Sequence, residues 1–164
     1  MWSVMPSKET KKTESALKLK IALLVILLLL FFVMAAITTL LLLTKPNIKK
    51  VTIGNSIYEL QVADTKEERE RGLSGQKELK KNGGMILDFN TDGDWGIWMK
   101  NMNFNIDIAW LDQSGKVVGI QKNVSPNSYP DSYNASADSR YVIELPHGTL
   151  SKNNINTGNF VKID

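Results

Sequence analysis

The chain has 164 residues, a formal net charge of +3, one histidine and no cysteine. Without cysteine it has no disulfides, no thiol nucleophile and no thiolate ligand for a metal. The positive charge belongs to residues 1–46, which carry six lysines and two glutamates, whereas residues 47–164 carry 14 basic and 15 acidic residues. Nucleic-acid binding needs a basic surface on the folded part of a protein. The charge distribution therefore argues against a nucleic-acid partner.

An unbroken apolar run occupies residues 21–43, in which Thr38 and Thr39 are the polar residues and no residue is charged. As a helix, these 23 residues would be roughly 34 Å long, enough to cross the hydrocarbon core of a bilayer. A cleavable signal peptide has a shorter apolar stretch, and a buried helix of a soluble domain keeps a polar face. We therefore favour a retained, single-pass transmembrane helix over both alternatives.

Lysines flank this run on both sides, and five of them precede it. A long C-terminal domain is translocated largely regardless of its charge. We predict that residues 1–20 form a cytoplasmic basic tail and residues 44–50 a short tether. Residues 51–164 then form an extracytoplasmic domain.

Short strand patterns dominate this domain from its start. Residues 49–53 and 57–63 are strand-like and flank a Gly-Asn-Ser turn, which predicts a hairpin. Thr65 and Glu68 have the spacing of a capping box, and Gly72 follows a charged run. That pattern predicts a short surface helix between Thr65 and Gly72.

The clearest hairpin pairs residues 104–111 with residues 116–124 across an Asp-Gln-Ser-Gly turn. Apolar residues alternate onto one face of its first strand: Phe104, Ile106, Ile108 and Trp110. The other predicted strands are 85–89, 96–99, 141–145 and 159–163, and residues 125–139 are predicted to form a long surface loop. These elements predict a mainly β fold, a compact antiparallel β-sandwich or barrel with one or two short helices.

Several motifs, in this order along the chain, resemble the DUF192 family, a domain of unknown function found in bacteria and archaea. They are Arg71-Gly-Leu-Ser-Gly75, Gly84-Met-Ile-Leu-Asp-Phe89, Trp98-Met-Lys-Asn101, Ile106-Asp-Ile-Ala-Trp110, the strand entry at Gly115–Ile120 and Val142-Ile-Glu-Leu-Pro-His-Gly148. The resemblance covers roughly residues 51–163. It implies a jelly-roll-like β-sandwich that is often exported or membrane-anchored, and it implies no reaction. Ser74, Gln76 and Met102 depart from the Met, Arg and Thr that are usual in the family.

The polar and aromatic members of these motifs and of the segment before Trp98 are the candidate ligand-binding residues: Trp95, Trp98, Lys100, Asn101, Asp107 and Glu144. The two indole rings offer flat faces to a sugar or another ring-bearing ligand. The charged side chains could line a cleft beside them. Alternatively, Lys100, Asp107 and Glu144 form a structural network that fixes strand register, since buried charges need partners.

Other motifs carry no specific chemistry. Residues 90–94 contain three acidic or amide side chains, but the spacing fails the EF-hand pattern and predicts a tight turn. A lone His147 without cysteine cannot build a zinc site. No phosphate-binding glycine motif occurs in the sequence. We therefore predict no metal site, no cofactor and no catalytic residue.

Three hypotheses on function follow. The favoured one is a non-enzymatic, membrane-anchored binding or interaction module outside a prokaryotic cell, whose partner is an envelope glycan, a small ligand or an envelope protein. The second is an envelope carbohydrate-active hydrolase that uses Asp107 and Glu144 as a carboxylate pair. The third is a structural accessory subunit of an envelope assembly.

Overall fold

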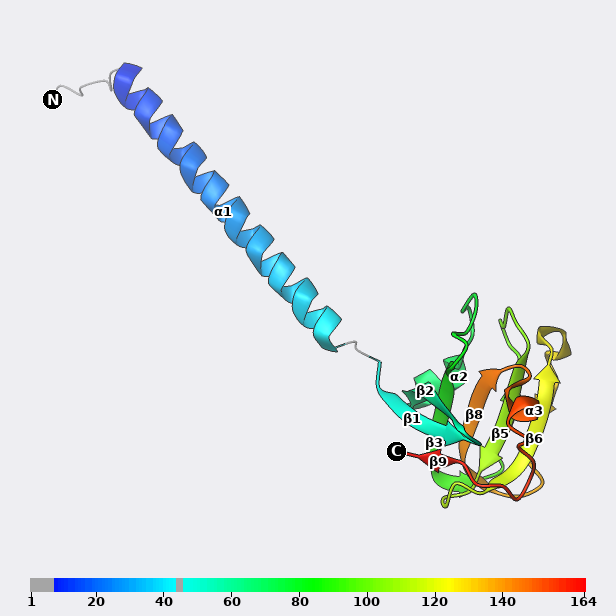
Figure 1. Cartoon of the computed structure of the whole chain (residues 1–164). Coiled ribbons are helices and arrows are strands. Elements are labelled where there is room, and N and C mark those ends of the chain that lie inside the picture. Colours follow the sequence, from blue (N-terminus) through cyan, green and yellow to red (C-terminus); the bar gives the residue numbers. More distant parts are fainter. Residues whose placement is uncertain (1–7, 44–45) are drawn as a thin grey trace. The chain divides into compact units, whose positions relative to one another are not determined.

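The computed structural model describes residues 8–43 and 46–164, and the chain divides into two compact units, Met1–Lys45 and Pro46–Asp164 (Figure 1). In the first unit, helix α1 spans Lys8–Leu43. By length and composition its segment Lys12–Leu41 could cross a membrane, and none of that segment is buried. Of the predicted tail and tether, residues 1–7 and 44–45 lie outside the described residues. Strand β1 begins at Ile48, within the predicted tether.

The second unit is mainly β, as predicted, with a few short helices. The strands are β1 (Ile48–Ile53), β2 (Ser56–Ala63), β3 (Gly83–Gly93), β4 (Ile97–Trp98), β5 (Ile106–Leu111), β6 (Val117–Val124), β7 (Ser132–Tyr133), β8 (Ser139–Pro146) and β9 (Lys162–Ile163). The helical elements are α2 (Lys66–Arg71), the short 3-10 helix Pro126–Ser128 and α3 (Thr149–Lys152).

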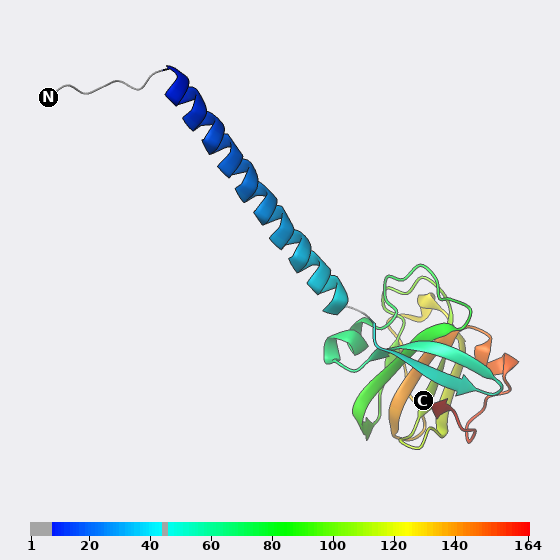
Figure 2. The ribbon, with the colours of Figure 1, turned by 60° about the vertical axis from the view of Figure 1, so that its left-hand side comes forward.

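Seven of these strands form one sheet in the order β6-β5-β8-β3-β2-β1-β9. Figures 1 and 2 show that this sheet is strongly curled. Its pairs are antiparallel except for β2 and β3, which are parallel because the chain passes through α2 between them. Strands β4 and β7 form a separate two-stranded ribbon, so the predicted loop at residues 125–139 contains a short strand.

The local predictions at the start of the domain are confirmed. Strands β1 and β2 form an antiparallel hairpin, with Ile53 opposite Ser56. The side chain of Thr65 accepts a hydrogen bond from the backbone N–H of Glu68, and the Glu68 carboxylate accepts from the backbone N–H of Thr65, so the capping box is present. Helix α2 then ends at Gly72, which has a φ of 49°.

Two apolar clusters lie on the two faces of the sheet. Neighbouring residues of a strand point to opposite faces, and on β5 this places Ile108 in one cluster and Ala109 in the other. All six residues of β5 are buried, because the strand is covered on both faces. We call the cluster that contains Ala109 and Leu150 the first cluster, and the cluster that contains Ile108 and Trp110 the second cluster.

Candidate functional site

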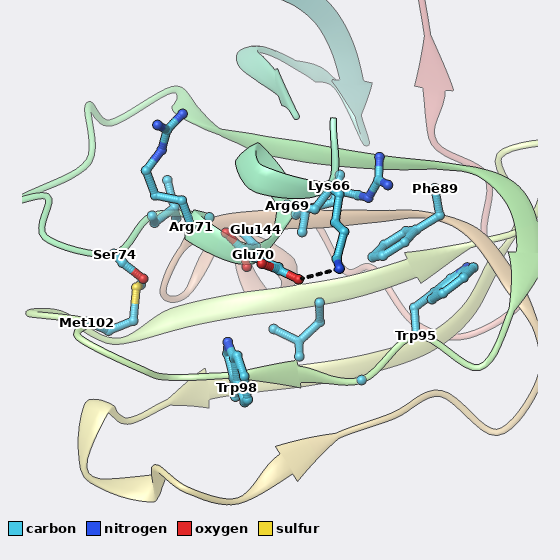
Figure 3. Close-up of a pocket in the computed structure, with 15 residues that line it drawn as sticks. Lys66, Arg69, Glu70, Arg71, Ser74, Phe89, Trp95, Trp98, Met102 and Glu144 are labelled. Atoms are coloured by element: carbon cyan, nitrogen blue, oxygen red, sulfur yellow. Dashed lines mark ion pairs between the residues drawn. The ribbon is translucent and has the colours of Figure 1, made fainter. Parts of the chain in front are cut away.

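A pocket of about 390 Å³ opens on the side of the second cluster (Figure 3). Its walls come from α2 and the turn that follows it, from the middle of β3, from β4 and the residues flanking it, and from Glu144 on β8. These segments are far apart in the sequence, and the curl of the sheet brings them together. A volume in this range suits a small molecule of one or two rings.

Glu144 is the one buried ionisable side chain in the lining of this pocket, with 5 % of its surface exposed. On β8 it lies opposite Ile108 of β5 and Met85 of β3, both of which are apolar. Its Oε2 atom has no hydrogen-bond partner among the described residues. Burial raises the pKa of the Glu144 carboxyl from 4.5 to about 7. Near neutral pH the group is therefore poised between its acid and its carboxylate form.

Two glycines let the backbone approach Glu144, one at its backbone carbonyl and the other at its carboxyl group. A Cβ atom on Gly84 would overlap the carbonyl oxygen of Glu144, so the close pairing of β3 and β8 requires glycine there. A Cβ atom on Gly72 would lie 3.6 Å from Oε2 of Glu144, and its φ of 49° also favours glycine. The end of α2 thus lies directly beside the Glu144 carboxyl.

Aromatic rings form a second part of the lining. Phe89 and Trp95 stack with 4.3 Å between ring centroids and an interplanar angle of 7°. The indole N–H of Trp110 donates to the backbone carbonyl of Trp95 at 2.8 Å, which holds this segment against the second cluster. Trp98 is 48 % exposed and meets the ring of Tyr129 edge-on. The pocket therefore has one fixed aromatic wall and one exposed aromatic edge.

Charged side chains of α2 lie around the mouth of the pocket. Lys66 and Glu70 form an ion pair at 3.7 Å, and both side chains are largely exposed (Figure 3). Arg69 donates to the backbone carbonyls of Asp64 and Asp88, and its guanidinium lies 5.1 Å from the centroid of the Phe89 ring. Arg71 is exposed. Exposed pairs of this kind are weak and are screened by salt.

The structure brings together three of the six residues predicted from the sequence, Trp95, Trp98 and Glu144. Lys100 and Asn101 are exposed and do not line the pocket. Their backbone carbonyls accept hydrogen bonds from the hydroxyl of Ser74 and the N–H of Gly75, respectively. The Lys100 ammonium lies 5.5 Å from the centroid of the Trp98 ring. These two residues join the end of α2 to the segment after β4.

Asp107 lies on the opposite face of the sheet from Glu144. It pairs with Leu145, whereas Glu144 pairs with Ile108, and the two positions therefore point to opposite faces. Its Oδ1 atom accepts from the N–H of Asn123 and its Oδ2 atom from the N–H of Leu150, each at 2.9 Å. The hypothesis that Asp107 and Glu144 act as a carboxylate pair fails on this geometry, because the sheet separates them. Asp107 therefore has a structural role through backbone N–H groups. The alternative of a network formed by Lys100, Asp107 and Glu144 is wrong, because no described hydrogen bond or ion pair joins these three side chains.

Sequence reasoning missed the contribution of α2 and of the segments next to it. The lining residues that it did not name as binding candidates include Lys66, Glu70, Arg71, Ser74, Phe89 and Met102. The capping box located α2, but no local pattern says which face of the sheet a short polar helix covers. Ser74 and Met102 are two of the three positions that depart from the usual family residues, and both line the pocket.

The protein is thus a mainly β, cysteine-free domain with a lateral aromatic pocket, preceded by an apolar helix. The chain belongs to the DUF192 family, described as uncharacterised ACR, whose family profile matches residues 49–163. No curated protein matches the chain.

Two solved structures share the fold. One is a Sinorhizobium meliloti 1021 protein described as a candidate transcription regulator, which is 23% identical with a TM-score of 0.66; the match covers 73% of this chain and 96% of that one. The other is a protein of unknown function from Novosphingobium aromaticivorans DSM 12444, which is 24% identical with a TM-score of 0.63; the match covers 71% of this chain and 84% of that one. At these identities the likeness shows the fold alone.

Proposed function

We propose that this protein is a non-enzymatic binding module, anchored in a prokaryotic cell membrane by α1, with its β domain on the extracytoplasmic side. The pocket beside α2 binds a small ring-bearing ligand, either free or as part of an envelope glycan or protein. One observation carries this proposal: a fixed aromatic wall and a buried carboxyl group without a partner line the same cavity. Pockets that combine apolar walls with a few directed polar groups are typical ligand sites.

The polar groups of the pocket support binding better than catalysis. The Ser74 hydroxyl donates to the backbone carbonyl of Lys100 at 2.8 Å, and no histidine lines the pocket to activate it. His147 is exposed and is not part of the lining. Ser74 and Met102, which replace the usual family residues, then adapt the pocket of this protein to its own ligand.

A hydrolase is the second candidate, with a different carboxylate pair from the one predicted. Glu70 is the other acidic residue that lines the pocket with Glu144. The buried Glu144, with its raised pKa, has the character of a general acid. Glu70 is largely exposed and paired with Lys66, so this pair is less well formed than the binding surface.

A binding screen on the full chain in detergent micelles tests the proposal. The panel contains mono- and disaccharides and small ring compounds, and tryptophan fluorescence and calorimetry report binding. Trp98→Ala should weaken ligand binding roughly fivefold, since an aromatic contact contributes about 1 kcal/mol. Phe160→Ala is the control because Phe160 is equally aromatic, 66% exposed and outside the pocket.

The outcomes separate the two candidates. Binding that survives both Trp98→Ala and Glu144→Gln would place the ligand elsewhere and contradict the proposal. Hydrolysis of a bound glycoside that disappears in both Glu144→Gln and Glu70→Gln would favour the hydrolase instead.

A further inference from the structure

The carboxyl group of Glu144 has no counter-cation in contact with it. Among the described residues no hydrogen bond or ion pair reaches it, and burial is the one cause of its pKa shift. The side chains beside it on β3 and β5, Met85 and Ile108, are apolar. The other ionisable residues that line the pocket all come from α2: Lys66, Arg69, Glu70 and Arg71.

The three basic residues of α2 do not neutralise Glu144. Lys66 is paired with Glu70, and Arg69 is held by two backbone carbonyls. In Figure 3 the guanidinium group of Arg71 points away from Glu144. The exposed charges at the mouth are screened by water and salt, whereas a charge in contact with a buried carboxylate acts at low effective dielectric. The charge of a ligand group that contacts Glu144 is therefore selected mainly by the Glu144 carboxylate and less by the exposed charges at the mouth.

Given a ligand in this pocket, as proposed above, we infer that it is a small organic cation, an amine or amidinium carried on a ring, whose charged end contacts Glu144. A buried carboxylate is stable when it is paired and hydrogen-bonded, and an ammonium or amidinium group supplies both the charge and the donors. The ring of the ligand lies against the aromatic lining formed by Phe89, Trp95 and Trp98. The electron-rich faces of such rings also attract cations.

This arrangement couples binding to a proton. Below pH 7 the Glu144 carboxyl is mostly protonated, since burial raises its pKa to about 7. The cation binds the carboxylate, so the carboxyl proton leaves to solvent and close to one proton is released for each ligand bound. Affinity should therefore rise from pH 5 to pH 7 and level off above it. The free cation stays protonated throughout this range.

Three probes of the same shape and different charge test the inference: benzamidine (cation), benzamide (neutral) and benzoate (anion). Their affinities for the full chain in detergent micelles are measured by calorimetry at pH 5.5 and pH 8, in two buffers with different ionisation enthalpies, so that proton release is measured directly. At pH 8 benzamidine should bind at least about fivefold more tightly than benzamide, because a hydrogen bond to a charged group exceeds a neutral one by about 1 kcal/mol or more. Benzoate should bind most weakly.

Glu144→Gln should reduce the ratio of benzamidine to benzamide affinity to about one and abolish proton release, while benzamide still binds. Glu67→Gln is the matched control, because Glu67 is an exposed residue of α2 that does not line the pocket. Equal binding of benzamidine and benzamide by the unmodified protein would overturn the cation inference and leave the binding function in place. Preference for benzoate, or no binding of any probe, would also overturn it. The broader screen above then decides whether the pocket binds a ligand at all.

Discussion

Glu144 occupies a position on β8 where its strand neighbours, Ile108 and Met85, are apolar. An ionised carboxyl group without a partner destabilises the folded state when it is buried among apolar side chains. The pKa of the group therefore rises, and it keeps its proton to higher pH. The effect of this burial on the free energy of unfolding can be measured without knowing the ligand. Its pKa lies near 7 in the folded chain and at 4.5 when the side chain is solvated.

The raised pKa predicts a pH-dependent effect of Glu144→Gln on stability. As pH rises from 4.5 to about 7, the unfolded chain loses the proton before the folded chain does, so the free energy of unfolding falls. The fall is complete above pH 7 and amounts to about 3 kcal/mol. The substituted glutamine is neutral throughout, so the variant should match the parent near pH 4 and exceed its stability at pH 8. Unfolding monitored by tryptophan fluorescence checks this, and a constant difference across the range would contradict it.

Asp107 shows how a buried charge can instead hold elements together. The register of β5 and β6 shifts between Ile106 and Ile108, which leaves an extra residue in β6. Asn123, in that bulge, has a φ of 54° and donates its N–H to Asp107. The other carboxylate oxygen accepts the N–H of Leu150 in α3. One side chain thus joins the bulge in β6 to the start of α3.

Replacing this carboxylate should loosen both elements. Asp107→Ala leaves two backbone N–H groups without their acceptor, which should cost roughly 2–4 kcal/mol of unfolding free energy. Asp107→Asn keeps one acceptor oxygen and should cost about half as much. Denaturant unfolding of both variants gives these values. Affinity of the folded variants for a pocket ligand should be unchanged, because Asp107 faces the other side of the sheet; a loss of affinity without a loss of stability would contradict the structural role.

At the scale of the whole molecule, the chain consists of an apolar helix and a β domain with different solvent requirements. The described side chains of α1 are exposed along its length, and large apolar ones such as Phe31 and Phe32 are about two-thirds exposed, at 66% and 65%. Exposure of such a surface to water is unfavourable by about 25 cal/mol per Å². A bilayer removes that cost, which supports the proposed anchor.

The proposed topology is tested by protease accessibility. Protease added to spheroplasts should digest the β domain, while a tag placed before residue 1 should survive until the membrane is opened with detergent. The physical reason is that a long domain after the span crosses the membrane, whereas the basic tail stays with the anionic cytoplasmic face. Protection of the domain in intact spheroplasts would contradict the orientation, and recovery in the soluble fraction would contradict the anchor.

Local sequence patterns account for the features that depend on neighbouring residues. The apolar run in α1, the β1–β2 and β5–β6 hairpins and the capping box of α2 all follow from patterns within about 25 residues. Trp95 and Trp98, which are three positions apart, both line the pocket. Each of these patterns reflects a local preference for helix, strand or turn, so no knowledge of distant pairing was needed.

Which side chains lie together on one face of the sheet depends on the pairing of distant strands. Whether Asp107 and Glu144 meet depends on the register of β5 against β8, and a shift of one residue would have moved Glu144 to the other side. The same register buries Glu144 in the second cluster, beside the turn at Gly72 that ends α2. Because these contacts join residues about 70 positions apart, they arise from strand order and sheet curl. The pocket and its unpartnered carboxyl group are therefore properties of the folded domain.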